Sequence, residues 1–544
     1  MMNKTGVFLC TCPATTTTIE MEKIAQGLDL PDTKVYSHMY LCSQRGLKYM
    51  EKCIKEDTLN RIVLVACSEN IHRNVFDGSR LLKEIGIEYI PVEGVLDEEA
   101  LLKRVQEVVK GEKAQITRVK EKIKEVLVIG GGVGGVQAAL DIAEGGYKVY
   151  LLEKTLSIGG AMAQLDKTFP TMDCSICILG PKLVDVSKHP NIELITHAEI
   201  KNITGDVGDF NVEVEIKPRY VDMEKCNGCS ACVEVCPVIL PNEWDLNLKP
   251  RKCIYIMFAQ SVPLRYTIDK DKCIECELCK KVCELDAINL NEEPKSRTLH
   301  VGAIVVTTGT KTFDASKKEE YGYGRLKNVV TNIEFERIVC ASGPTGGELI
   351  RTDGKHMKNV AFIQCVGSRD VHFHDYCSVY CCLASIKEAR LVLEHDKDAE
   401  VWIFYNDVRA CGKGFEELYV RSKKEGMNFI KGLPGEVRED PETGDPIVIY
   451  EGPKAGKYSE LQVDMVVLAV ALEPSEEIAR LSEMLHLETD IHGFFKGLHP
   501  NSRPLETTNK GIFLAGTCQG PKDIPETVSQ ASGAAAKVCT LFSG

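Results

Sequence analysis

The sequence predicts an α/β protein in which a dinucleotide-binding fold is interrupted by a cysteine-rich insert. Three observations lead to this fold class. Strand-length apolar runs alternate with helical segments along most of the 544 residues. A glycine-rich turn joins a strand, a helix and a second strand over residues 126–154. Two tightly spaced cysteine runs break the α/β pattern between residues 218 and 296.

The glycine-rich turn follows a short apolar, β-branched run that is typical of a strand buried on both faces. Gly130, Gly132 and Gly135 fill the G-x-G-x-x-G pattern. The first permits a tight turn, the second lets the backbone approach a pyrophosphate, and the third lets the helix pack closely. The helix expected from Gly134 offers unpaired N–H groups to phosphate. Glu153 follows the second strand, where a carboxylate accepts ribose hydroxyls, so the offsets favour a bound dinucleotide over a unit without ligand.

Composition excludes several classes of function. The formal net charge of −13 argues against a nucleic-acid or anionic-membrane partner. The N-terminus lacks a secretory apolar region, and no apolar run approaches the ~20 residues that span a bilayer. We therefore expect a soluble, cytoplasmic protein without direct membrane insertion. The 24 cysteines exceed what packing requires, and in a reducing compartment such clusters indicate metal ligands, which predicts a metal-cluster redox protein.

Residues 1–115 are predicted to form a small α/β domain with cysteines at its strand ends. The predicted strands and helices are residues 6–10, 61–66, 20–27 and 45–55. Cys10 and Cys12 follow the first strand, Cys67 follows another, and Cys42 opens a helix. Because the carboxyl ends of parallel strands share one edge of a sheet, these thiols can converge. Buried free cysteines are the alternative, since cysteine is among the most buried residue types.

A charged helical segment over residues 110–124 is the predicted linker to the dinucleotide unit. Beyond that unit, Gly159 and Gly160 are placed to approach a bound cofactor. Cys174 and Cys177 then form a C-x-x-C pair. On spacing alone the pair has three interpretations, namely a redox dithiol, half of a metal site, or two packed thiols.

The cysteine-rich insert carries the spacing of a two-cluster ferredoxin. Two runs with the spacing C-x2-C-x2-C-x3-C contain Cys226, Cys229, Cys232 and Cys236, and then Cys273, Cys276, Cys279 and Cys283. In such proteins the fourth cysteine of each run binds the other cluster. One [4Fe–4S] cluster is therefore assigned to Cys226, Cys229, Cys232 and Cys283, and the second to Cys273, Cys276, Cys279 and Cys236. Zinc sites do not use this crossed arrangement. We expect Trp244, Tyr255 and Phe258 to pack the insert onto its neighbour.

After the insert the α/β pattern resumes. Predicted strands over residues 300–307 and 511–515 end in Thr308-Gly309 and Gly516-Thr517, and a small-residue helix follows over 526–538. A second α/β segment, about 346–474, has strands predicted at 359–364 and 400–405. Its first strand lacks a second G-x-G-x-x-G and leads instead to four cysteines, Cys365, Cys377, Cys381 and Cys382. These suit either a cluster or buried free thiols.

The sequence resembles the A-type subunit of heterodisulfide reductase over essentially its whole length. The matching strings are FLCTC, MYLCSQRG, VACS, GGAMAQLDKTFPTMDCSICILGPKLVDV, CNGCSACVEVCPVILPNEWD, QCVGSRD, YCSVYCCLASIKEA and GIFLAGTCQGPKDIPETVSQAS. The resemblance implies a thioredoxin-reductase-like FAD-binding core of two dinucleotide domains, an inserted 2×[4Fe–4S] ferredoxin and an N-terminal α/β cluster domain. The chain departs from longer members because no C-terminal ferredoxin pair follows.

The resemblance also implies sites. Cys10, Cys12, Cys42 and Cys67 become ligands of an N-terminal cluster, and Cys365, Cys377, Cys381 and Cys382 become ligands of a cubane beside the flavin, which makes four [4Fe–4S] clusters with FAD. Lys387 and Cys382 are the implied catalytic residues, with Lys387 near the flavin. FAD contacts are expected from Gly130, Gly132, Gly134, Gly135, Glu153, Lys154, Gly159, Gly160, Met162, Thr308, Gly309, Gly516, Thr517 and Pro525.

The implied domains are an N-terminal iron–sulfur domain (1–115), an FAD-binding domain in three parts (116–217, 297–345 and 475–544), the inserted ferredoxin (218–296) and a second Rossmann-like domain (346–474). The implied activity is that of an oxidoreductase subunit performing flavin-based electron bifurcation between a donor, a high-potential disulfide-reductase acceptor and ferredoxin. The implied partners are B- and C-like subunits, a hydrogenase or formate dehydrogenase donor, ferredoxin and a second copy of the chain. The alternatives are a non-bifurcating electron-transfer hub of a quinone-linked or aromatic-ring-reducing complex, and an NAD(P)H-dependent flavoprotein oxidoreductase.

Overall fold

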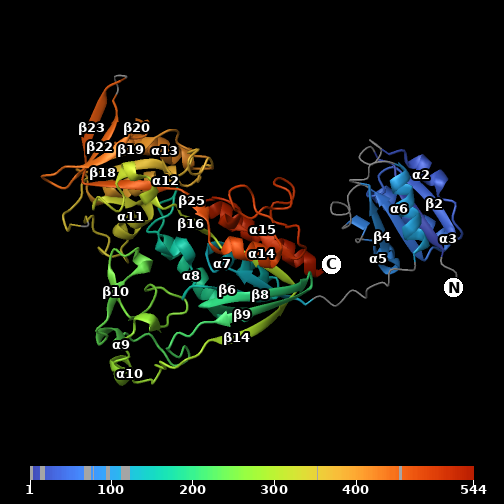
Figure 1. Ribbon diagram of the computed structural model, residues 1–544, viewed down its shortest axis with the longest axis horizontal. Helices are drawn as coiled ribbons and strands as arrows, with labels where there is room; N and C mark the ends of the chain where they lie inside the picture. The colour runs from blue at the N-terminus through green and yellow to red at the C-terminus, as the bar shows by residue number, and fades with distance from the viewer. Residues whose placement is uncertain are drawn as a thin grey trace. The chain divides into compact units, whose positions relative to one another are not determined.

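The computed structural model describes residues 4–12, 19–66, 75–76, 79–92, 98–111, 123–351, 353–452 and 456–543. They form two compact units, one within residues 1–121 and the other within residues 122–543 (Figure 1). Most of the predicted 110–124 linker lies outside the described residues, as does Cys67. None of the helices described is both long and apolar enough to cross a bilayer.

The first unit is a four-stranded parallel sheet with the strand order β2-β1-β3-β4. Its strands are β1 (Thr5–Cys10), β2 (Thr33–His38), β3 (Arg61–Ala66) and β4 (Ile87–Pro91). Its helices are α2 (Met21–Gly27), α3 (Gln44–Asp57), α5 (Arg80–Ile85) and α6 (Glu98–Lys110). β1 and β3 are buried along their whole length, as their apolar sequences predict.

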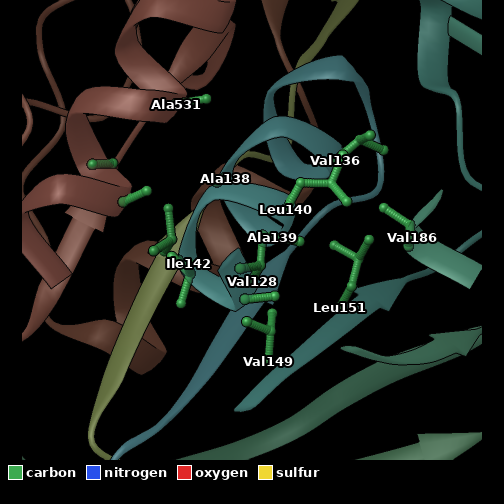
Figure 2. Close-up of a cluster of buried hydrophobic side chains, with 14 of the residues drawn as sticks. Val128, Val136, Ala138, Ala139, Leu140, Ile142, Val149, Leu151, Val186 and Ala531 are labelled. Atoms are coloured by element: carbon green, nitrogen blue, oxygen red, sulfur yellow. The ribbon is translucent and has the colours of Figure 1, made fainter. Parts of the chain in front are cut away.

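The second unit is centred on a five-stranded parallel sheet with the order β26-β15-β5-β6-β7. The strands are β5 (Glu125–Ile129), β6 (Lys148–Glu153), β7 (Ile192–Thr196), β15 (Ala303–Val306) and β26 (Ile512–Leu514). Helices α7 (Val133–Glu144), α8 (Ser175–Lys188) and α15 (Ile524–Ser543) pack with it. Figure 2 shows the apolar core around α7, with Ala139 next to Val128 of β5 and with α15, which carries Ala531, alongside.

The predicted strand over residues 300–307 is two strands. β14 (Lys295–Val301) pairs antiparallel with β9 (Asp209–Ile216), which in turn pairs with β8 (Ala198–Asp206), whereas β15 joins the parallel sheet beside β5. The break falls at Gly302, where an added Cβ would lie 1.9 Å from the carbonyl oxygen of Ile123. Continuous apolar sequence did not reveal this change of sheet, because Val301 at the end of β14 is buried just as the residues of β15 are.

The second Rossmann-like domain repeats the architecture with the strand order β17-β24-β18-β19-β20, again all parallel. Its strands are β17 (Val329–Thr331), β18 (Asn359–Val366), β19 (Glu400–Tyr405), β20 (Asn428–Lys431) and β24 (Met465–Val470). Its helices are α11 (Asn332–Val339), α12 (Cys381–His395) and α13 (Phe415–Lys424).

Smaller elements complete this region. An antiparallel meander is formed by β21 (Glu436–Glu439), β22 (Pro446–Glu451) and β23 (Tyr458–Gln462). The strands β16 (Thr310–Thr312) and β25 (Leu472–Pro474) pair antiparallel, and α14 (Glu477–Leu485) follows. β16 follows β15 of the first parallel sheet, and β25 follows β24 of the second. Their pairing therefore connects the two sheets at the carboxyl ends of β15 and β24.

The insert contains two short helices, α9 (Ala231–Glu234) and α10 (Leu278–Val282), that contact each other. Two antiparallel pairs accompany them, β10 (Ile239–Pro241) with β11 (Pro250–Lys252) and β12 (Ile254–Tyr255) with β13 (Thr267–Ile268). The rings of Trp244 and Phe258 stack at 4.4 Å and pack against the core of the FAD-binding sheet. Their predicted packing role is thereby confirmed, while Tyr255 instead lies over the guanidinium of Arg251.

Candidate functional site

The turn after β5 is a cradle that side chains would fill. Gly130 has a left-handed φ of 105°, which glycine adopts without strain. A Cβ on Gly135 would lie 1.8 Å from the carbonyl oxygen of Gly130, so the helix packs on the turn as the motif predicts. A Cβ on Gly132 would meet no atom within 4 Å. Gly132 therefore faces open space at the N-terminus of α7, where a pyrophosphate binds in this motif.

The loop after β6 closes against this turn. Gly159 donates its N–H to the carbonyl of Gly131 at 2.7 Å and pairs with Gly132 in an isolated parallel bridge. A Cβ on Gly160 would lie 2.9 Å from the Cα of Gly132. The short helix η1 (Gly160–Gln164) begins there and carries the buried Met162. The structure therefore places the predicted pair Gly159 and Gly160 directly against the predicted glycine turn.

Glu153 lies at the end of β6 with only 8% of its surface exposed. Its carboxylate accepts the N–H of Gly131 at 2.7 Å and that of Thr155 at 2.8 Å. The acid is thus held against the glycine turn, at the position where the dinucleotide motif places a ribose acceptor. Lys154 is exposed and pairs with Glu477 at 3.8 Å.

The remaining predicted FAD contacts lie where β15, β26 and α15 meet the turn. A Cβ on Gly130 would approach the carbonyl of Thr307 to 2.6 Å, and the buried Thr308 hydroxyl has no hydrogen-bond partner. Gly134 and Gly516 both face the methyl group of Thr527, at 3.1 and 3.0 Å from their ideal Cβ positions. Gly309 and Thr517 approach each other, and Pro525 lies in the first turn of α15. An open glycine cradle with an unpartnered hydroxyl fits the pyrophosphate and flavin of FAD.

In the second domain, the strand equivalent to β5 leads to thiols. Cys365 lies near the end of β18 with a left-handed φ of 60°, at an irregularity in strand register. Cys381 and Cys382 begin α12 and are 5% and 6% exposed. Cys377 precedes them in a loop where Val379 also adopts a positive φ of 63°. This conformation is strained for a β-branched residue, and it lets a short loop turn back toward β18.

The four thiols are close enough to influence one another. Burial, together with the neighbouring Cys382 and Cys377, raises the pKa of Cys365 to about 11. Burial likewise raises the pKa of Cys381 well above its usual range, with Cys382, Cys365 and Cys377 adding to the effect. Mutual repulsion between thiolates and burial both disfavour four free anions here. Neutralising this charge, as iron would do, would stabilise such a group. Cys381 and Cys382 both lie near enough to Cys365 to affect its pKa or be affected by it, although they begin a helix.

Lys387 is buried on the same helix, with 2% of its surface exposed, and its ammonium contacts the carboxylate of Glu336 on α11. Burial lowers the pKa of Lys387 to about 8, while the carboxylates of Glu388 and Asp166 favour its charged form. The second oxygen of Glu336 accepts the N–H of Asp166 at 3.0 Å. Arg337, the next residue, bonds Asp245 of the insert at 2.9 Å and the carbonyl of Gln164 at 3.0 Å. This network joins the second domain, the FAD-binding domain and the insert.

Three further buried polar groups lie on α12 and β18 without partners. Both oxygens of Glu388, the hydroxyl of Ser385 and both amide atoms of Gln364 make no hydrogen bond. Burial raises the pKa of Glu388 to about 8, opposed by the nearby Lys387. A neutral carboxyl tolerates this environment better than a carboxylate does.

The insert brings the second predicted ligand set around one cavity. Cys236, Cys273, Cys276 and Cys279 line it together with Cys253. This is the crossed set that the spacing predicts, although residue 236 lies far from the others in sequence. In the other set, burial and then Cys226 and Cys229 raise the pKa of Cys232 to about 12. Cys283 packs in the same apolar cluster. Among the described residues, no three ligand-type side chains converge as they would on a single metal ion.

In the N-terminal unit three of the four predicted thiols converge. Cys10 and Cys12 are 2% and 4% exposed, and burial raises the pKa of Cys10 to about 11, with a contribution from Cys12. Burial and Cys12 also raise the pKa of Cys42. The fourth predicted ligand, Cys67, lies outside the described residues. Cys53 points to Tyr49 on its own helix, in keeping with a structural role.

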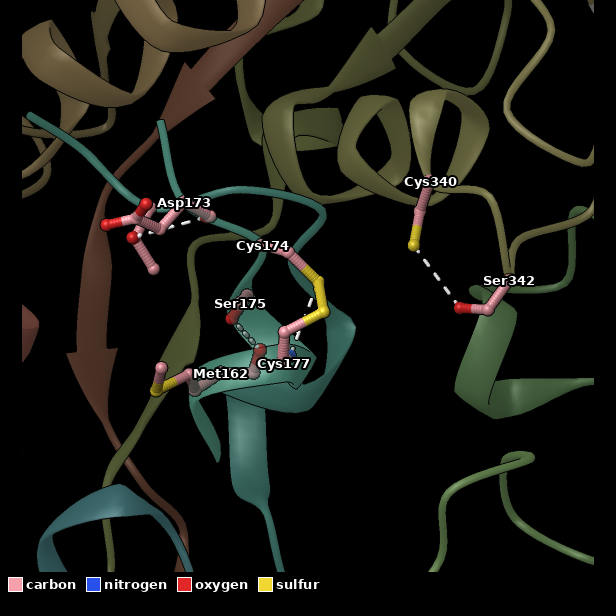
Figure 3. Close-up of a disulfide and its surroundings, with 8 residues drawn as sticks. Met162, Asp173, Cys174, Ser175, Cys177, Cys340 and Ser342 are labelled. Atoms are coloured by element: carbon pink, nitrogen blue, oxygen red, sulfur yellow. Dashed lines mark hydrogen bonds between the residues drawn. A yellow bond between two sulfur atoms is a disulfide. The ribbon is translucent and has the colours of Figure 1, made fainter. Parts of the chain in front are cut away.

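The sulfurs of the C-x-x-C pair are bonded to each other in the structure, which is the oxidised state of a dithiol. Cys174 and Cys177 form a disulfide with a Cα–Cα distance of 5.3 Å (Figure 3). The pair lies at the start of α8, where Cys174 is the N-cap residue.

Sequence reasoning missed Glu336, Asp166 and Thr527. Each acts through a contact with a residue far away in the chain, and although Asp166 and Thr527 lie within the matching strings, no spacing marks them as functional. The only signal for Glu336 is a charged residue on the apolar face of a short amphipathic helix, which is weak on its own.

Family models match two parts of the chain. The FAD-dependent oxidoreductase family matches residues 125–172, which contain the glycine turn, Glu153 and Gly159. The 4Fe-4S binding domain family matches residues 219–238 and 266–289, which contain both cysteine runs. Both matches coincide with the cradle and the cavity described above.

The chain is 46% identical to the A-type iron–sulfur subunit of the CoB–CoM heterodisulfide reductase of Methanocaldococcus jannaschii, over 99% of this chain and 85% of the relative. It is 45% identical to the A-type subunit of the H2:CoB-CoM heterodisulfide,ferredoxin reductase of Methanothermobacter thermautotrophicus, over 98% and 84%. It belongs to the family of heterodisulfide reductase A-type subunits. As a member it is an oxidoreductase subunit that carries electrons through FAD and iron–sulfur clusters.

Among solved structures, thioredoxin reductase of T. acidophilum aligns with 77% of this chain and 98% of its own, at 15% identity and a TM-score of 0.43. Thioredoxin reductase of Lactococcus lactis aligns over 77% and 99%, at 16% identity and a TM-score of 0.43. The predicted α/β architecture of two dinucleotide-type domains with an inserted ferredoxin is confirmed by the strand orders of the two sheets and by the family matches.

Proposed function

We propose that this chain is the electron-bifurcating subunit of a heterodisulfide-reductase-type complex. In this proposal a donor subunit delivers electron pairs, one electron of each pair goes to a high-potential disulfide-reductase acceptor, and the other goes to low-potential ferredoxin. The chain holds FAD and four [4Fe–4S] clusters, at the sites assigned above. Complexes that differ in electron donor use related chains, as the names of relatives include H2, formate and ferredoxin.

The observation that carries the proposal is the meeting of four thiols at the start of α12, one and a half turns before the buried Lys387. The same strand end would hold a nicotinamide dinucleotide in a two-dinucleotide-domain oxidoreductase, but here residues 367–380 replace the glycine turn. A one-electron carrier therefore takes the place of a two-electron cofactor.

The chain's residues divide the tasks. When bound, FAD supplies the change between two-electron and one-electron chemistry. The ammonium of Lys387 is buried, and Glu336 orients it, so a positive charge is available in a low-dielectric region to favour an anion beside it. Cys382 and its three partners hold one outlet, and the insert holds the second. Two separate outlets are required because each ~59 mV shifts a one-electron equilibrium tenfold, so a shared path would drain both electrons to the stronger acceptor.

The proposed partners follow from this division. B- and C-like subunits receive the high-potential electron, a hydrogenase or formate dehydrogenase supplies pairs, and ferredoxin takes the low-potential electron. The proposal places the complex in the cytoplasm, with two copies of this chain.

Stoichiometry in the assembled complex tests the proposal. Each donor pair should reduce ferredoxin and the disulfide acceptor in fixed proportion, and omission of either acceptor should stop turnover of the other. Independent reduction of either acceptor would instead identify a non-bifurcating hub. NAD(P)H should not bleach the flavin within the turnover time, and rapid bleaching would support the NAD(P)H oxidoreductase alternative.

A further inference from the structure

We propose that Cys174 and Cys177 form a redox-active disulfide that exchanges an electron pair with an external dithiol. The site is separate from the cluster ligands and goes beyond the proposed function, which transfers single electrons through iron. Figure 3 shows the bonded sulfurs at the start of α8, with Ser175 bonded to Met162 behind them.

The two sulfurs differ in access. Cys177 is exposed, whereas Cys174 is half-buried. The next residue, Ile178, is 43% exposed, and Val184 on the same helix is 41% exposed. An incoming thiolate therefore reaches the Cys177 sulfur first, beside an apolar surface.

The buried sulfur is placed to leave as a thiolate. Cys174 is the N-cap of α8, and its sulfur accepts the N–H of Cys177 at 3.3 Å. A helix N-terminus stabilises a thiolate, and a lower leaving-group pKa speeds exchange. Attack on Cys177 therefore releases the sulfur that the helix stabilises.

The exchange balances without another reagent. A thiolate of the external dithiol attacks the Cys177 sulfur, the Cys174–Cys177 bond breaks, and Cys174 leaves as a thiolate that takes a proton. The second thiolate of the external dithiol then attacks its own half of the mixed disulfide and releases Cys177. The chain gains two electrons and two protons, and the external dithiol becomes a disulfide.

The pair is rigidly tied to the loop that meets the glycine cradle. The buried Ser175 donates its hydroxyl to the carbonyl of Met162 at 2.7 Å and its N–H to the carbonyl of Asp166 at 2.9 Å. The N–H of Asp166 bonds Glu336, which holds Lys387. A change in the bonding of Cys174 is thus transmitted to the residue next to it and, through two hydrogen bonds, to the buried lysine network.

Differential alkylation of the purified full-length chain tests this inference. Tryptic residues 168–182 contain both cysteines and no other, so mass spectrometry reports this pair alone. The chain is equilibrated anaerobically with mixtures of reduced and oxidised dithiothreitol, or with reduced thioredoxin, and acid-quenched. We expect a reversible two-electron titration. The inference would be overturned if the pair stayed oxidised in excess reduced dithiothreitol, or stayed reduced in excess oxidised dithiothreitol. Response to dithiothreitol but not to thioredoxin would identify a small dithiol as the partner, and response to both would identify a partner class that includes protein dithiols.

Single-sulfur variants separate exchange from metal binding. Cys174→Ser, which leaves the exposed Cys177, should form a mixed disulfide with oxidised glutathione at least tenfold faster than Cys177→Ser, with iron and flavin contents unchanged. Cys411→Ser, at an exposed free cysteine, is the control. Equal rates, or iron loss in either cysteine variant of the pair, would contradict the assignment. The rates of mixed-disulfide formation are measured separately from iron and FAD contents, so they can be interpreted even if the proposed function is wrong.

Discussion

The two parallel sheets of the second unit share the order of four neighbouring strands, but the end of the central strand is used differently in each. In the FAD-binding sheet, β5 lies between β15 and β6, and in the other sheet β18 lies between β24 and β19. After β5, three residues lead into α7, and Gly132 faces open space. After β18, residues 367–380 intervene before α12 begins at Cys381. A short connection exposes a helix N-terminus to phosphate, whereas a long one wraps thiols around it.

The helices differ in the same way. The buried side of α7 consists of glycine and aliphatic residues (Figure 2), and its half-buried Asp141 accepts a hydrogen bond from the hydroxyl of Ser532 on α15 at 2.5 Å. The buried side of α12 includes Lys387, Glu388 and Ser385. Buried charges are costly unless they are paired, so their presence on α12 marks a region shaped for electrostatics instead of stability. The comparison teaches that topology sets where a site forms, while the connection and the helix face decide its chemistry.

The largest effect is expected from Cys382→Ser, which removes a thiolate from the α12 group. Electron exit through this group should fall to background while FAD stays bound, because the glycine cradle is untouched. Iron per flavin and turnover in the assembled complex measure the two effects. The matched control is Cys340→Ser, a buried cysteine that bonds Ser342 at 3.2 Å. Normal turnover with complete iron content would show that Cys382 is not a ligand.

Gly132→Ala is the corresponding change at the other strand end. Its Cβ meets no protein atom, so the chain should fold normally. The methyl group nevertheless occupies the space assigned to pyrophosphate, and FAD affinity should fall at least about tenfold, or ~1.4 kcal/mol. Flavin fluorescence on reconstitution measures this affinity.

Gly180→Ala is the control for this substitution. Gly180 lies within α8 away from the glycine turn, and apart from its chain neighbours its Cβ would also meet nothing within 4 Å, so alanine should keep FAD affinity. Unchanged FAD affinity in Gly132→Ala would refute the proposed pyrophosphate position.

Lys387→Met tests the buried charge on α12. It leaves Glu336, which is 1% exposed, without its cation, and we expect a loss of about 3–5 kcal/mol in unfolding free energy. Adding Glu336→Gln should recover part of that loss, because no unpaired charge remains. Thermal denaturation of the anaerobic protein gives both values. Lys424→Met, at an exposed position of α13, should change stability by less than about 0.5 kcal/mol. If Lys387→Met and Lys424→Met lost similar amounts of unfolding free energy, the ion pair between Lys387 and Glu336 would not be stabilising the fold.

A pH dependence of stability is expected from Glu388. The folded-state pKa of Glu388 is about 8, above its usual 4.5, so the folded chain holds this proton more tightly than the unfolded chain. Its contribution to stability is complete below pH 4.5 and is lost as pH rises toward 8, by at most about 1.4 kcal/mol per pH unit. The pKa of Lys387 is lowered to about 8, so this residue makes stability depend on pH only above about pH 8.

Glu388→Gln should therefore reduce the fall of the melting temperature between pH 5 and 7.5 relative to the parent chain. Glu394→Gln, at a residue of α12 whose side chain is 40% exposed, should leave the slope unchanged. Identical slopes in Glu388→Gln and the parent chain would mean that the carboxyl is ionised when folded.

Short-range patterns were sufficient for much of this protein. The turn from Gly130 to Gly135 and the strands β3 and β19 have their predicted places, because each depends on neighbours within a few residues. The strand predicted over residues 300–307 was wrong in one respect, since a contact between Gly302 and Ile123 divides it. The ligand sets, the domain limits and the number of clusters stay predictions.

By itself, the sequence determined the glycine cradle, the cysteine runs of the insert and the α/β class, because local spacing sets the geometry of turns and closely spaced ligands. Only the tertiary structure decided which distant groups meet. Cys365 reaches Cys382 because β18 and α12 are packed together, and Lys387 reaches Glu336 and Asp166 because α11 and the loop after η1 close over α12. Such contacts depend on the packing of whole elements, and no periodicity within one element encodes them.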